Sequence, residues 1–151
     1  MIVVGIDPGV DGAIAVISHG GEVICWDMPA IEVRGKRRLD AGGLARLLVD
    51  IGPAAMTVVE DVQGVQGSGA TSAFNFGRGV GVIEGVLVAL DRPHTFVRPQ
   101  QWTKDLCVGA DKGAHRLMAQ RLWPTDAHQF ARVKDDGRAD AALLAHWWGR
   151  R

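Results

Sequence analysis

The sequence predicts an α/β fold in which three antiparallel strands come first and two later strands alternate with helices. The chain opens with three short segments of strand character separated by turns, which is typical of an antiparallel meander. Further along, two short apolar segments are each followed by residues with helical periodicity. At 151 residues and 47% apolar content, the chain has the size of one domain with one substantial core. We therefore expect a single domain over residues 1–151.

The turns define the first three strands. Residues 2–6 are wholly apolar, and the Asp-Pro-Gly-Val-Asp-Gly turn at 7–12 separates them from the apolar residues 13–17. The Gly-Gly pair at 20–21 makes the next turn. Residues 22–27 then alternate polar and apolar side chains, as a strand with one exposed face does.

The basic segment at residues 34–38, Arg-Gly-Lys-Arg-Arg, is expected to form a loop. Asp40 is a suitable N-cap for a helix that continues to Ile51, because apolar residues recur on one stripe. Gly52-Pro53 end this helix. A short buried strand follows at residues 56–59, directly before Glu60.

The second half is predicted to be mainly helical. Residues 63–69 are too rich in glycine for regular structure and predict a loop, and apolar periodicity predicts a long helix over 71–90. We expect a strand at 94–97, helices at 99–106 and 113–122, and a final helix starting near Asp136.

The long helix is unusual in its glycine content. Each glycine costs ~1 kcal/mol relative to alanine in a helix interior, so their accumulation suggests that another backbone comes close, through packing or dimerisation. The four residues concerned are Gly77, Gly79, Gly81 and Gly85.

The overall charge neither requires nor excludes a nucleic-acid partner, because 17 basic residues balance 17 acidic ones. Basic residues nevertheless outnumber acidic ones over residues 92–134. No targeting segment and no apolar stretch approaching the ~20 residues of a membrane span is present. We expect a cytoplasmic protein with no membrane association.

Four acidic residues occupy positions that favour metal binding. Asp7 and Glu60 each end an apolar strand, where a bare buried carboxylate would be costly. Asp136 and Asp140 are four residues apart, which places their Cβ atoms ~5–6 Å apart on one helix face. A divalent cation converts this repulsion into chelation, and hard oxygen ligands suit Mg²⁺ or Mn²⁺.

Each acid also has an alternative explanation. Asp-Pro-Gly is an ordinary turn sequence, and Asp136 taken alone is better explained as a helix N-cap. Glu60 has little local structural purpose, and the joint occurrence of the acids favours metal binding at all four positions.

These segments resemble the RuvC-type Holliday junction resolvases of the ribonuclease H-like superfamily, and most closely their bacteriophage branch. Gly5-Ile6-Asp7-Pro8-Gly9 is similar to the first-strand motif, Val58-Val59-Glu60 to the second acidic motif, and residues 72–79 to the glycine-containing helix after it. Ala110-Asp111-Lys112 resembles a segment with a substrate-binding lysine. Residues 134–145 are similar to the C-terminal motif that holds the last two acids.

The resemblance implies a ribonuclease H-like mixed sheet, three antiparallel strands then two parallel, flanked by helices. It also implies a homodimer that binds four-way DNA junctions and nicks opposed strands by hydrolysis with two Mg²⁺ ions per active site, Mn²⁺ substituting. Asp7 would bridge both ions, Glu60 and Asp140 would each hold one, and Asp136 would complete a shell or orient water. The residues expected to contact DNA are Arg34, Lys36, Arg37, Arg38, Arg78, Lys104 and Lys112.

The chain departs from the family pattern in two places. Cellular members carry an aromatic wedge shortly after the second acid, whereas this chain reads Asp-Val-Gln-Gly at 61–64. In many members the penultimate acid lies three residues before the last, and that position is Gly137 here. We choose Asp136 over Asp135, because its four-residue spacing keeps it on the face of Asp140.

Other readings of the sequence lead to different functions. A nuclease of the same fold acting on flaps, forks or replication intermediates shares the phosphodiester chemistry and is the main alternative. An actin-like or sugar-kinase ATPase has a similar first hairpin but needs a second domain, so we expect no nucleotide cofactor. A binding module without catalysis is disfavoured because it would be free to lose these costly acids.

The aromatic and histidine residues are not expected to take part in chemistry. We expect Trp102, Trp123, Trp147 and Trp148 to lie in the core or in a dimer contact, since aromatics at helical spacing usually do. The five histidines show no metal-ligand spacing, so no catalytic or metal role is expected for them.

Overall fold

The computed structural model describes residues 1–62 and 69–151 and contains a five-stranded mixed sheet in the order β3-β2-β1-β6-β7. Its strands β1, β2 and β3 pair antiparallel, whereas β6 is parallel to β1 and β7 is parallel to β6. The predicted arrangement, three antiparallel strands followed by two parallel ones, is confirmed. The strands are β1 (Val3–Asp7), β2 (Ala13–Ile17), β3 (Val23–Asp27), β6 (Met56–Glu60) and β7 (His94–Val97).

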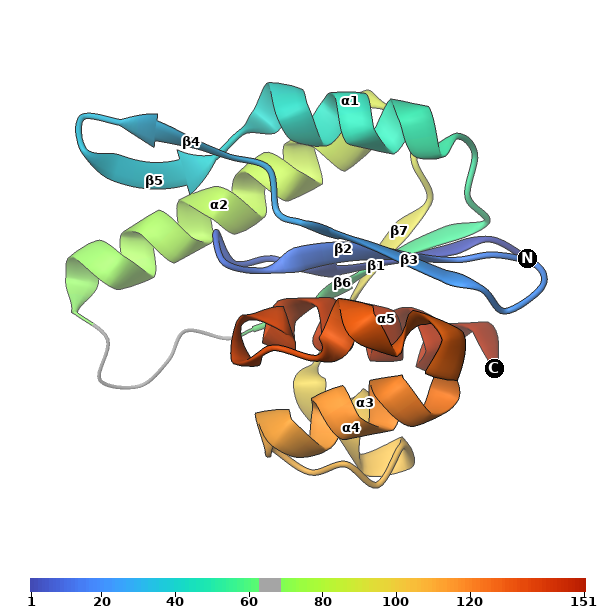
Figure 1. Ribbon diagram of the computed structural model, residues 1–151. Helices are drawn as coiled ribbons and strands as arrows, with labels where there is room; N and C mark the ends of the chain where they lie inside the picture. The colour runs from blue at the N-terminus through green and yellow to red at the C-terminus, as the bar shows by residue number, and fades with distance from the viewer. Residues whose placement is uncertain (63–68) are drawn as a thin grey trace.

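Helices cover both faces of this sheet (Figure 1). One face carries α1 (Ala41–Ile51) and α2 (Ala70–Ala89). The other face carries α3 (Pro99–Asp105), α4 (Lys112–Leu122) and α5 (Asp136–Gly149), with the short 3-10 helices η1 (Pro124–Phe130) and η2 (Val133–Asp135) between α4 and α5. Each predicted helix is present, with ends within one residue of the prediction.

The central strand β1 sends side chains into two cores. Val3 belongs to the cluster under α5, whereas Val4 and Ile6 belong to the cluster that α1 and α2 cover. Because successive side chains of a strand point to opposite faces, a strand buried on both faces must be apolar at every position. This explains why residues 2–6 lack the polar alternation seen in β3.

Helix α5 lies against β1 at a distance that only small residues allow. A Cβ atom on Gly5 would come within 2.0 Å of the Ala141 carbonyl oxygen. A Cβ atom on Gly137 would lie 3.0 Å from Asp7 Oδ2, and one on Gly149 would lie 3.7 Å from Val3. The helix therefore runs antiparallel to β1, with its N-terminus at the end of the strand that carries Asp7.

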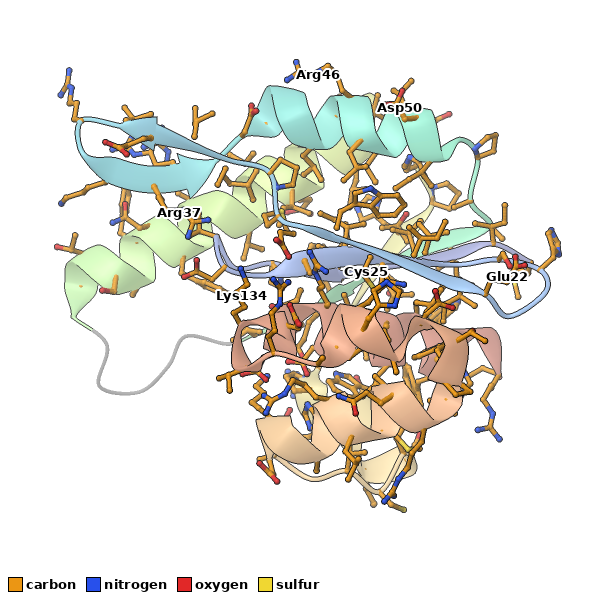
Figure 2. All side chains as sticks on the ribbon, viewed as in Figure 1. Glu22, Cys25, Arg37, Arg46, Asp50 and Lys134 are labelled. Atoms are coloured by element: carbon orange, nitrogen blue, oxygen red, sulfur yellow. The ribbon has the colours of Figure 1, made fainter. Side chains whose placement is uncertain are left out.

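The basic segment was predicted as a loop, and this prediction is wrong. It belongs to a separate two-stranded hairpin of β4 (Ala30–Val33) and β5 (Lys36–Leu39). The connecting residues Arg34 and Gly35 both have positive φ, +52° and +72°, as a two-residue type I′ turn requires. Arg37 forms an ion pair with Asp11, which holds the hairpin against the turn between β1 and β2 (Figure 2).

The glycines of α2 do not serve packing inside the chain. A Cβ atom at Gly77, Gly79, Gly81 or Gly85 would meet no described atom within 4 Å beyond the helix's own backbone. A close approach by another segment of the described chain is therefore excluded as their reason, whereas dimerisation stays a prediction. The predicted loop at 63–69 falls, except for Gly69, outside the described residues. Within the described chain, no helix has both the length and the hydropathy to cross a membrane.

The different surroundings of Gly5 and Gly81 predict opposite effects when each is changed to alanine. Gly5→Ala forces a methyl group into the Ala141 carbonyl, and we expect it to lower the free energy of unfolding by about 3 kcal/mol. Gly81→Ala adds its methyl in open space within a helix, and we expect stabilisation of up to ~1 kcal/mol. Urea denaturation followed by circular dichroism measures both. A Gly5→Ala protein as stable as the wild type would contradict the close contact.

Candidate active site

Three predicted acids converge where β1 and β6 end. Strands β1 and β6 are parallel neighbours in which Ile6 pairs with Val59. The next residues, Asp7 and Glu60, therefore lie side by side at the ends of the two strands. Asp140 comes from α5, one turn beyond Gly137, whose backbone packs on the Asp7 carboxylate. All three acids thus lie where two parallel strands end under the N-terminal part of α5.

Electrostatics confirm that these carboxylates affect one another. Burial raises the pKa of Asp7 from 3.8 to about 7, and the charges of Asp140 and Glu60 contribute to the increase. Burial also raises the pKa of Glu60, again with a contribution from Asp140. Each acid therefore loses hydration and meets like charge, a combination that favours a proton or a cation at the cluster.

Lys112 on α4 brings a positive charge to the acids. It forms an ion pair with Asp140 Oδ2 and lowers the pKa of both Asp7 and Glu60. Burial opposes its charged form, but the ion pair with Asp140 outweighs this, so the pKa of Lys112 is raised. About half of its side chain, 52%, remains exposed, which leaves this ammonium group accessible from solvent.

Two buried aromatic side chains make polar contacts with Glu60 and Asp140. The Trp102 indole N–H donates to Glu60 Oε1 at 3.0 Å, and His115 Nδ1 lies 2.6 Å from Asp140 Oδ1. Trp102 lies in the core as predicted, but its contact with Glu60 was not foreseen. Of the two, only His115 could have been found from the sequence, because it lies three residues after Lys112 and hence on the same helix face.

The two acids before Gly137 have their own basic partners. Asp136 pairs with Arg116 of α4. Asp135 is buried, accepts a hydrogen bond from the Arg132 backbone N–H at 2.8 Å, and pairs with the Arg132 guanidinium, also at 2.8 Å. The N-cap explanation for Asp136 is wrong, because this residue is already helical and Asp135 occupies the capping position. A metal role for Asp136 stays a prediction.

Within residues 1–62 and 69–151, no three acidic, histidine or cysteine side chains form a ready-made metal site. The contacts of Asp140 give a physical reason, since Lys112 and His115 each engage one of its oxygens. The donor set nevertheless fits Mg²⁺ or Mn²⁺, because it consists of carboxylates, and burial together with neighbouring like charge raises the pKa of Asp7 and of Glu60. Movement of the half-exposed Lys112 would free Asp140 Oδ2 for such an ion.

The basic residues predicted to contact DNA come from separate elements. Lys112 forms an ion pair with Asp140 and so lies at the acidic cluster. Figure 2 shows both Arg37 and Lys134 on the side of the molecule where α5 begins. The others lie on the hairpin (Arg34, Lys36, Arg38), on the exposed part of α2 (Arg78) and on α3 (Lys104).

The raised pKa of Asp7 predicts how stability depends on pH without metal. The native state binds this proton more tightly than the unfolded state, so ionisation of Asp7 destabilises the fold progressively from about pH 4 to pH 7. Asn cannot ionise. We expect Asp7→Asn to be more stable than the wild type at pH 8 in EDTA by about 4 kcal/mol, with little difference near pH 4. Urea denaturation at both pH values measures this, and equal stability at pH 8 would contradict the raised pKa.

Comparison with known proteins gives structural matches only. No family model and no curated protein matches the sequence. RuvC of T. thermophilus in complex with a Holliday junction substrate superposes with a TM-score of 0.64 at 15% identity, covering 99% of this chain and 96% of that one. The fowlpox virus Holliday junction resolvase gives 0.57 at 13% identity, covering 99% and 98%. The yeast mitochondrial resolvase Ydc2 gives 0.56 at 15%, covering 98% and 78%. This chain therefore has the ribonuclease H-like fold of RuvC.

Proposed function

We propose that this protein is a Holliday junction resolvase, a metal-dependent endonuclease that nicks opposed strands of four-way DNA junctions. The observation that carries the proposal is the convergence of Asp7, Glu60 and Asp140 where β1 and β6 end. The solved structures that share the fold include a complex with a Holliday junction substrate. Carboxylates gathered at the end of parallel strands suit the chemistry of phosphodiester hydrolysis.

The proposed cofactor is Mg²⁺, two ions per active site, with Mn²⁺ able to substitute. Asp7, Glu60 and Asp140 would hold the ions, and Asp136 would contribute once released from Arg116. Two bound ions would supply Lewis-acid activation of the attacking water and stabilisation of the leaving 3′-oxygen. Asp7 would be central to holding the ions, because the charges of both Asp140 and Glu60 act on it.

The chain's own cations would position the DNA. Lys112 is half exposed beside the acids, so its ammonium can neutralise a phosphate there when it leaves Asp140. The β4–β5 hairpin offers Lys36 and its neighbours next to the turn that follows Asp7, to which Arg37 ties it. Such contacts read the backbone rather than the bases, so binding is expected to depend on salt and little on sequence.

We propose that the protein acts as a homodimer, since two opposed nicks need two active sites. The alternative is a nuclease of the same fold that cuts flaps or forks. One observation keeps it open: the described residues after Glu60, Asp61 and Val62, include no aromatic side chain that could wedge a junction apart.

Cleavage of matched substrates tests the proposal. Four-way junction, flap, fork and linear duplex are incubated with the protein and Mg²⁺, with Ca²⁺ in place of Mg²⁺ in parallel. We expect paired symmetric nicks in the four-way junction alone. Asp7→Asn should abolish cleavage, because it removes a carboxylate that would hold the ions, and should leave junction binding nearly intact. Cutting by this variant at the wild-type rate would refute the site, and equal cutting of flaps and forks would favour the alternative.

Lys112→Ala tests the phosphate contact. We expect weaker junction binding and a slope of log affinity against log salt smaller by about one phosphate contact. The matched control is Arg46→Ala, which removes an exposed cation from α1, on the opposite face of the sheet from α4. Fluorescence anisotropy in Ca²⁺ at several salt concentrations measures both variants. An unchanged slope for Lys112→Ala would remove this residue from the interface.

A further inference from the structure

Trp102 is the largest side chain that is fully buried, with 1% of its surface exposed. A buried indole needs an acceptor for its N–H, and a backbone carbonyl usually suffices. Here the acceptor is Glu60 Oε1, at 3.0 Å, on a carboxylate whose pKa is raised. The hydrogen bond therefore engages one defined oxygen of a candidate metal ligand and leaves the second, Oε2, to face another partner.

His115 makes an equivalent contact to Asp140. Its Nε2 lies 2.9 Å from the carbonyl oxygen of Gly109, which can only accept, so Nε2 carries a hydrogen. The other nitrogen, Nδ1, lies 2.6 Å from Asp140 Oδ1, a carboxylate oxygen that also accepts, so the protonated ring donates from both nitrogens. Both ring nitrogens are thus engaged, which fixes the plane of a side chain that is 3% exposed.

The contacts divide the two oxygens of Asp140 between unlike partners. Oδ1 meets the buried ring of His115, whereas Oδ2 meets the half-exposed ammonium of Lys112. A lysine on a flexible stem exchanges easily with solvent ions, but a buried ring does not. His115 can therefore keep Oδ1 of Asp140 in place while a cation replaces Lys112 at Oδ2. The carboxylate would then have the same orientation with and without the cation.

The two rings also contact each other. Trp102 and His115 meet edge to face, with centroids 5.1 Å apart and planes at 60°. The result is one continuous path of contacts, Glu60–Trp102–His115–Asp140, through β6, α3, α4 and α5. Each member limits the rotamers of the next, so the orientations of the two carboxylates are linked.

We propose that Trp102 and His115 are positioning residues, which hold Glu60 and Asp140 in the orientation that binds divalent cations. Partners behind metal ligands commonly set ligand orientation, and their loss typically costs 10–100-fold in metal affinity or activity. The inference rests on the proposed function for the role of the cation, but it concerns binding and can be tested without DNA.

The chain contains a matched control for this pair. Trp123 and His146 also meet edge to face, with centroids 5.5 Å apart. The Trp123 indole N–H donates to the carbonyl oxygen of Gly21 at 2.8 Å rather than to an acid. Trp123→Phe therefore removes a buried indole hydrogen bond of the same kind away from the carboxylates.

Calorimetric titration with Mg²⁺ and with Ca²⁺ tests the proposal. We expect Trp102→Phe and His115→Phe to bind both ions about 10-fold more weakly than the wild type, and Trp123→Phe to bind them normally. His115→Asn should recover most of the affinity, because its side-chain amide can donate to Asp140 from the position of Nδ1. Circular dichroism and urea denaturation establish that each variant folds. Wild-type affinity in both Trp102→Phe and His115→Phe would overturn the proposal.

A second measurement needs no core substitution to fold. In ¹⁵N-labelled wild-type protein, Ca²⁺ should shift the indole N–H resonance of Trp102 and leave that of Trp123 in place. Through-space contacts in the wild type assign the two resonances. An unshifted Trp102 resonance at saturating Ca²⁺, or a wild type that binds neither ion, would also overturn the proposal. Normal ion binding with the expected variant effects but no junction cleavage would instead refute the proposed function alone.

Discussion

The close contact between α5 and β1 is the constraint on which the rest of the structure depends. Gly5 has no side chain, so the backbone of α5 at Ala141 can reach the centre of the sheet. At the other end of this contact, Gly137 in the first turn of α5 packs against Gly12 and Asp7. A helix held further from the sheet would place Asp140 away from the end of β1. The small residues at this interface therefore determine where the carboxylates meet.

Gathering three carboxylates in a partly dehydrated site has an electrostatic cost that the fold only partly offsets. Burial and mutual repulsion raise the pKa of Asp7 to about 7, so its ionised form destabilises the native state near neutral pH. Lys112 offsets part of this charge, while Trp102 and His115 supply directed hydrogen bonds. Sites built for catalysis often keep such costly arrangements, because the same charge that destabilises the free protein favours the cation it binds.

Helix α4 connects the acids to the surface. Lys112 and His115 face Asp140 from it, and Arg116, one turn beyond Lys112, holds Asp136. The side chain of Asp111 caps the same helix by accepting from the backbone N–H groups of Gly113 and Ala114, which fixes where the helix starts. A capped first turn thus sets the position of Lys112, the residue that lies between the buried acids and solvent.

The sequence by itself determined the five strands of the central sheet, the α-helices and the acids at the ends of β1 and β6. These follow from local periodicity and from the cost of a carboxylate at the end of an apolar strand. The sequence did not indicate the β4–β5 hairpin, whose turn places Arg34 at positive φ without the Asn-Gly pair that usually announces such a turn. Only the tertiary structure decided the partners of the acids. Trp102 meets Glu60 across 42 residues and His115 meets Asp140 across 25, and no local pattern encodes such contacts, since they arise from helices packing on the sheet.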